Sequence, residues 1–277
     1  MPLNWTISSV NSAQALRWTE ILFAVSLVIQ TVEYLRMSHA TATQGLWAWP
    51  IQRLDIPTPW VRRFLDICFQ PFCHQMHLWM RCVSAGILIF IGGSFALIAF
   101  LFIGNLLILI RWRGAFNGGS DFLTLVVLTG LLIAYGVGSG GDADLGARAG
   151  LWYVCIQSVT SYFMSGTVKL LRPEWRSGRA MIIFLNAAIY GPLPPHHWLS
   201  QRFWAVIGSW AFILWECAFP LALLSPMHAV GFCVIASLFH FLVFWFFGLN
   251  RFFWAWIANL SSVFFLSHWI YSIFTIT

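Results

Sequence analysis

Long apolar stretches separated by short polar turns constrain this chain more than any other feature. A helix that crosses a membrane needs about 20 mainly apolar residues. Eight stretches of the chain approach or reach that length: 17–35, 72–91, 94–110, 122–136, 150–171, 203–225, 230–247 and 252–274. We therefore predict an all-α fold, a polytopic membrane helical bundle of about eight transmembrane helices.

The composition excludes the main soluble classes. Charged residues make up 9% of the 277 residues, against about 25% in an ordinary soluble domain. Hydrophobic residues make up 60%, more than a soluble fold of this size can bury. We expect the lipid bilayer as partner and no nucleic acid, because the basic residues are scattered between apolar stretches. Without a long polar linker or a repeat, residues 1–277 read as a single transmembrane domain.

Two segments leave the helix count and the topology open. Gly92 and Gly93 separate the second stretch from the third, although residues 82–110 could also form one long tilted helix, which would give seven spans. Residues 180–190 are apolar but too short to cross a bilayer, and a proline-rich run, 191–195, follows them. They predict a short interfacial or re-entrant helix.

Ionisable side chains inside apolar stretches are costly, so each one needs a partner or a function. Glu20 has Arg17 three residues before it, a spacing at which the two side chains meet on a helix. Glu216 lies in the middle of its stretch with no local partner, so its neutralising group must come from another helix. His240 and Lys169 are both candidates, and a structural and a functional role for Glu216 remain equally open.

Lys169 is the single lysine of the chain, whereas fourteen basic residues are arginine. As an anchor at the membrane surface, a lysine could be replaced by an arginine. Unlike arginine, a buried lysine can lose its proton. The exclusive use of arginine elsewhere therefore favours a deprotonable amine at Lys169 over a simple anchor.

Two polar clusters at the beginnings of apolar stretches have ordinary structural explanations. Cys68 and Cys73 could form a disulfide in an oxidising compartment, but their spacing to the following histidines fits neither a haem nor a zinc motif, so we predict no metal. Asn117 and Asp121 bracket a glycine turn in which a polar side chain can cap the next helix. The functional alternative for that turn is a backbone approach to a ligand.

A sequence motif around the lysine resembles a known family. Tyr162, Gly166, Lys169 with Leu170, Trp175 and Gly178 have a spacing similar to the motif of the HTTM (horizontally transferred transmembrane) superfamily. That superfamily includes the vitamin K-dependent gamma-carboxylases and the sporulation-delaying protein B family. The short length of the chain and the run at 190–194 are closest to the second family. Further matching pieces are Asn117, Asp121, Glu216 and His240.

The resemblance implies a membrane-embedded enzyme in which Lys169 acts as a base, with a reduced quinone as the cofactor. Glu216 and His240 would tune the lysine or relay protons. Tyr162 and Trp175 would line the pocket. The arginines that would hold an anionic group of the substrate are Arg172, Arg176 and Arg179.

The sporulation-delaying protein B resemblance implies help in the maturation of a small secreted peptide, in a bacterial cytoplasmic membrane. A non-catalytic membrane factor that binds or exports a peptide toxin is the alternative, and a secondary transporter ranks behind both. Orientation is contested: the positive-inside rule places both termini outside, whereas the family resemblance places the loop after Lys169 outside.

Overall fold

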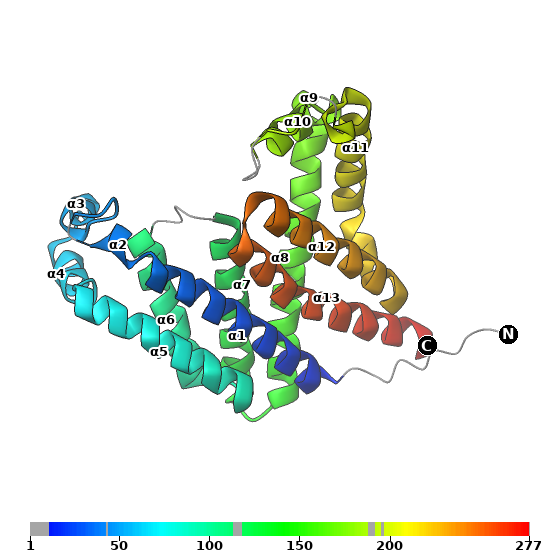
Figure 1. The fold of residues 1–277 in the computed structure, drawn as a ribbon. Helices are drawn as coiled ribbons and strands as arrows, with labels where there is room; N and C mark the ends of the chain where they lie inside the picture. Colours follow the sequence, from blue (N-terminus) through cyan, green and yellow to red (C-terminus); the bar gives the residue numbers. More distant parts are fainter. Residues whose placement is uncertain (1–10, 43, 113–117, 188–191, 195–196, 277) are drawn as a thin grey trace. The chain divides into compact units, whose positions relative to one another are not determined.

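The computed structural model describes residues 11–42, 44–112, 118–187, 192–194 and 197–276. Every regular element in these ranges is a helix, which confirms the predicted all-α class (Figure 1). Asn117 and most of residues 188–196 lie outside the described residues, so the predictions made for them are not addressed.

In the part of the chain that the structure describes, eight long helices lie at the eight predicted stretches. They are α1 (Ser12–Arg36), α5 (Pro71–Phe90), α6 (Phe95–Trp112), α7 (Gly118–Gly138), α8 (Ala143–Leu171), α11 (Arg202–Ala218), α12 (Pro226–Phe247) and α13 (Asn250–Ile276). Among the described residues, six of these segments are long and apolar enough to cross a membrane: α1, α6, α7, α11 extended through η3, α12 and α13. The other two, α5 and α8, carry more polar side chains, and the count of about eight spans stays a prediction.

Short helices connect the long ones. They are α2 (Ser38–Thr41), α3 (Trp49–Gln52), η1 (Arg53–Asp55), α4 (Pro59–Cys68), α9 (Pro173–Arg176), α10 (Arg179–Asn186), η2 (Trp198–Ser200) and η3 (Phe219–Leu223). Proline occupies the first turn of several of them, where its missing N–H costs no helical hydrogen bond. The helix predicted at 180–190 is α10, which packs against α9 and α11.

The chain divides into two compact units. The N-terminal unit is Leu16–Gly150, and the C-terminal unit is Leu151–Thr277 together with Met1–Ala15. Each unit is described by itself below.

In the N-terminal unit, a sharp turn separates α5 from α6. Gly92 adopts a φ of 111°, a backbone conformation that residues other than glycine rarely adopt. A Cβ on Gly93 would overlap the Tyr135 ring. The glycine pair therefore ends one helix and begins another, and the alternative of one long helix over 82–110 is wrong.

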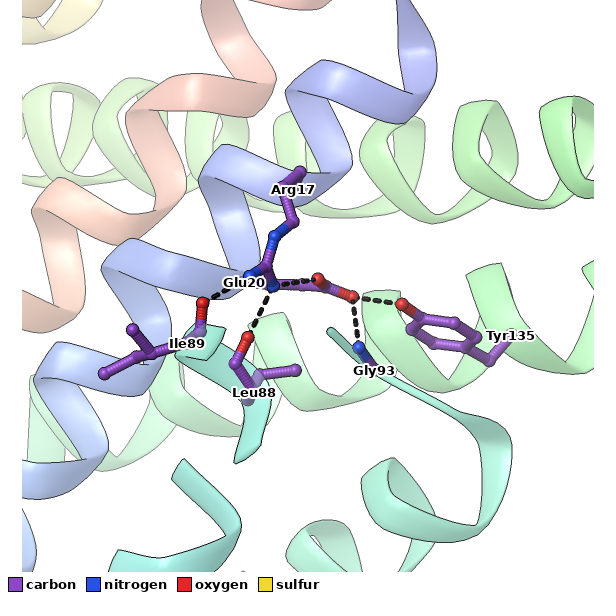
Figure 2. A network of polar contacts seen from close by, with 6 residues as sticks. All are labelled: Arg17, Glu20, Leu88, Ile89, Gly93 and Tyr135. Carbon is purple, nitrogen blue, oxygen red and sulfur yellow. Dashed lines mark hydrogen bonds and ion pairs between the residues drawn. The ribbon is translucent and has the colours of Figure 1, made fainter. Parts of the chain in front are cut away.

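Glu20 is the centre of a buried polar network in the same unit (Figure 2). Arg17 Nη1 lies 3.0 Å from Glu20 Oε2, which confirms the predicted pair. The Gly93 N–H donates to Glu20 Oε1 at 3.3 Å, and the Tyr135 hydroxyl donates to the same oxygen. Arg17 also donates to two main-chain carbonyls near the end of α5 (Figure 2). One carboxylate thus joins α1 to α7 and to the turn between α5 and α6.

The segment between α1 and α5 holds a second ion pair. Arg53 donates to both carboxylate oxygens of Asp66, at 2.9 and 2.7 Å, and Trp49 Nε1 donates to one of them at 2.8 Å. The hydrogen bonds from Arg53 and then Trp49 lower the pKa of Asp66, since both favour the charged carboxylate. Cys68 and Cys73, at the end of this segment, are free thiols rather than a disulfide.

In the C-terminal unit, α12 packs along α13, and both contact η3. Gly248, with a φ of 67°, closes α12. The outer face of α12 is an apolar stripe at helical spacing: Val230, Val234, Leu238, Phe241 and Trp245 are all exposed. Water-exposed apolar stripes of this length are unusual in soluble proteins, whereas lipid would cover such a face without cost.

Candidate functional site

One face of α8 carries a line of polar side chains. Ser158, Tyr162, Ser165 and Lys169 follow one another at intervals of three or four residues, which places them on the same side of a helix. Tyr162 and Lys169 are seven residues apart, or about 10 Å along the helix axis. Each of the four side chains forms a hydrogen bond with a polar side chain of another helix in the C-terminal unit.

Lys169 and Glu216 form a largely buried ion pair at one end of this line. Lys169 Nζ lies 2.8 Å from Glu216 Oε1 and 2.6 Å from Oε2. Their side chains are 16% and 4% exposed. Of the two partners considered for Glu216, the structure therefore selects Lys169, and it joins α8 to α11 across 47 residues of sequence.

Two further residues complete the surroundings of the amine. Ser165 Oγ accepts from Lys169 Nζ at 2.6 Å and donates to Glu216 Oε1 at 3.2 Å. The Trp175 ring centroid lies 5.2 Å from the same nitrogen, within the range of a cation–π contact. The sequence predicts Trp175 in the wall of this pocket. It does not single out Ser165, although a spacing of four residues before Lys169 on a helix is a usable signal.

A glycine allows the two helices of the pair to approach closely. A Cβ on Gly166 would lie 2.6 Å from the Cys217 backbone nitrogen and 2.9 Å from the Glu216 carbonyl carbon. Backbone atoms cannot move aside as a flexible side chain can, so only glycine fits here without separating the helices. Small residues serve the same purpose at many membrane helix contacts.

We expect Gly166→Ala to lower the free energy of unfolding by about 1–3 kcal/mol, the usual cost of overpacking a well-packed contact. Gly231→Ala on α12 is the matched control, because a Cβ there meets no atom within 4 Å and alanine favours the helix. Unfolding in mixed micelles measures both. Equal stability of the two variants would contradict the close contact between α8 and α11.

His240 forms a second buried pair further along the line. The Tyr162 hydroxyl lies 2.7 Å from His240 Nε2. The Tyr162 ring stacks on Phe219 with centroids 3.9 Å apart, and the His240 ring stacks on Trp256 at 4.6 Å. His240 Nδ1 is buried and has no hydrogen-bond partner among the described residues. His240 is therefore the hydrogen-bond partner of Tyr162 and not of Glu216. Aromatic contacts hold the rings of Tyr162 and His240 in place.

The other predicted site residues lie apart from this line. Arg172, Arg176 and Arg179 are exposed on and beside the short helices α9 and α10. Asp121 lies buried in the first turn of α7, in the N-terminal unit. Their predicted roles in holding a ligand stay predictions.

The described chain is thus all-helical, with six apolar helices compatible with a membrane protein and a buried lysine–carboxylate pair. Comparisons with protein-family models, with curated proteins and with solved structures found no match.

Proposed function

We propose that this protein is an integral membrane enzyme of the HTTM type, in a bacterial cytoplasmic membrane, that transfers protons through Lys169 while it modifies a small secreted peptide. The observation that carries the proposal is the largely buried contact between the single lysine and Glu216. An anchor at the membrane surface would leave its ammonium group in water. This amine instead has a carboxylate, a hydroxyl and an aromatic ring around it.

The pair suits proton transfer because its charges are largely removed from water. Charged groups lose hydration in such a site, so an ammonium–carboxylate pair and a neutral amine–carboxylic acid pair come closer in free energy. When substrate displaces the remaining water, the Nζ proton can move to a Glu216 oxygen along the existing 2.6 Å hydrogen bond. The neutral amine then accepts a proton from an acidic C–H or O–H bond of the substrate, whose electron pair stays behind as an anion.

The residues around the Lys169–Glu216 pair would have supporting roles. Ser165 holds Lys169 Nζ toward Glu216 through its two hydrogen bonds. The exposed arginines Arg172, Arg176 and Arg179 follow α8 directly, where their planar guanidinium groups can hold a carboxylate of the substrate. The Tyr162–His240 pair keeps the inner part of the line packed and hydrogen-bonded.

A reduced quinone, which the family resemblance implies, is compatible with these residues. The Trp175 ring next to Lys169 offers an aromatic face. Trp175 would hold the ring by stacking, and Lys169 would hold the proton of a ring hydroxyl. When bound, such a cofactor would supply reducing equivalents.

The test compares the peptides secreted by cells that contain the wild-type protein, the Lys169→Arg variant or no copy of the gene. Arginine keeps the charge and the reach of lysine but does not deprotonate. We expect Lys169→Arg to lower the amount of the mature peptide by about 100-fold or more, the lower range for the loss of a general base. Mass spectrometry of the secreted peptides measures the change.

Arg148→Lys is the matched control, since it exchanges the same two residue types at an exposed position paired with Asp144. It should leave the peptide unchanged. Full maturation by the Lys169→Arg variant would overturn the enzymatic proposal and favour a non-catalytic factor that binds or exports the peptide, because charge alone would then suffice.

A further inference from the structure

A cavity of about 230 Å³ lies within the N-terminal unit. Its wall comes from the last turns of α1 and α6, the first turns of α5, and α2. Its polar lining is Ser38, Thr41, His74, Gln75 and Arg111. The volume falls below the roughly 300–1,000 Å³ of sites that enclose a drug-sized ligand. The cavity therefore has room for a small ion or the head group of a larger molecule.

Arg111 gives the cavity its charge. The residue is 1% exposed, and its guanidinium donates to the carbonyl oxygens of Trp47 and Thr41 and to Gln52 Oε1, the last two at 2.8 Å. It also lies over the Phe69 ring at 5.7 Å. All of these acceptors are neutral. They satisfy N–H groups of Arg111 but leave its positive charge without a counter-ion.

No carboxylate contacts Arg111 in the described part of the chain. Asp66, in the segment that covers the cavity, is already bound by Arg53 and Trp49. The segment 36–71 contains four arginines and two aspartates, so its net charge is positive as well. An uncompensated buried charge is costly, and a bound anion would offset that cost.

His74 is a second polar residue of the cavity wall. Its side chain lines the cavity and is 7% exposed, and its Nε2 has no hydrogen-bond partner among the described residues. The Arg111 Nε–H likewise has none. Buried polar atoms in proteins are nearly always hydrogen-bonded, so these two residues of the cavity wall still have hydrogen-bonding capacity that no described residue uses.

We propose that this cavity binds a phosphate group, either as a free phosphate ion or as the head group of an anionic lipid, with Arg111 as the counter-ion. Guanidinium geometry matches phosphate oxygens. The cavity also lies at the ends of α1 and α6, both apolar enough to cross a membrane, and phosphate head groups occupy that level of a bilayer. Basic pockets between membrane helices bind such head groups in other proteins.

The first experiment measures the melting temperature of the purified protein in detergent with increasing sodium phosphate, against sodium chloride of equal ionic strength. The second reconstitutes the protein in phosphatidylcholine vesicles with and without phosphatidylglycerol, and counts the lipids retained after extraction by native mass spectrometry. A melting temperature that rises with phosphate but not with chloride identifies the ligand as a free phosphate ion. If phosphatidylglycerol is retained and phosphate does not change the melting temperature, the ligand is a lipid head group. Either result supports the proposal.

Two variants test the role of the charge. Arg111→Gln should weaken phosphate binding by about tenfold or more, the effect of losing one charged hydrogen bond. Because Arg111 also holds the segment over the cavity, Ser38→Asp provides an independent test: a carboxylate in the lining would occupy the site of the anion without removing any contact of Arg111. Arg148→Gln, at an exposed ion pair away from the cavity, should bind as the wild type does.

The proposal is overturned if neither phosphate nor phosphatidylglycerol binds, or if both Arg111→Gln and Ser38→Asp bind like the wild type. Should Arg111→Gln fail to fold, Ser38→Asp alone decides. Unchanged binding by that variant then rejects the site, and lost binding with an undiminished melting temperature supports it.

Discussion

Replacing Glu216 by leucine should destabilise this protein by about 3–5 kcal/mol, the usual cost of removing one partner of a buried ion pair. Lys169 Nζ would keep Ser165 as a hydrogen-bond partner but lose both carboxylate contacts. Its charge would then remain largely buried without a counter-ion. The free energy of unfolding in mixed micelles measures the loss.

The double variant Lys169→Met with Glu216→Leu is the matched control. Replacing both members of a buried ion pair by apolar groups of similar size is often neutral or stabilising. We therefore expect the double variant to recover stability to within about 1 kcal/mol of the wild type while losing the proposed activity. A double variant as unstable as Glu216→Leu alone would show that the two residues do not form a pair.

Replacing Glu20 by leucine should lower the free energy of unfolding by about 2–4 kcal/mol, since each buried donor left without an acceptor costs about 1–3 kcal/mol. The Gly93 N–H and the Tyr135 hydroxyl both lose the carboxylate oxygen that accepts from them (Figure 2). Arg17 keeps its two carbonyl acceptors, so its contribution to the loss is smaller. The same unfolding measurement applies.

Glu20→Gln separates hydrogen bonding from charge at this position. The glutamine retains one acceptor oxygen of the same reach, so we expect a loss of about 1 kcal/mol, close to one neutral hydrogen bond. If Glu20→Gln and Glu20→Leu lower the free energy of unfolding equally, the ion pair with Arg17 accounts for the loss of stability. The contacts to Gly93 and Tyr135 then contribute little.

Much of the helix pattern follows from local sequence. In the described residues, the eight apolar stretches form eight long helices, because in lipid a single apolar run of that length can satisfy its backbone hydrogen bonds within itself only as a helix. The turn between α5 and α6 also follows from the sequence, since Gly92 and Gly93 interrupt an apolar run. Pairs within one turn, such as Arg17 and Glu20, follow from helical spacing alone.

The identity of long-range partners did not follow in the same way. Glu216 needed a counter-ion, and both His240 and Lys169 were chemically suitable. The choice depends on which face of α8 meets α11, and that depends on the close approach at Gly166. The pairing of His240 with Tyr162 has the same origin, because aromatic packing against Phe219 and Trp256 orients both rings.

The sequence by itself determined the class of the fold and the positions of the long helices. It also singled out Lys169, the one lysine beside fourteen arginines. Those properties depend on hydrophobic length and residue type, which act locally. Only the tertiary structure decided that Lys169 meets Glu216, that Ser165 joins them, and that the buried Arg111 lines a cavity with neutral acceptors alone. Such contacts join residues that are four to seventy positions apart, and their geometry exists only after the helices pack.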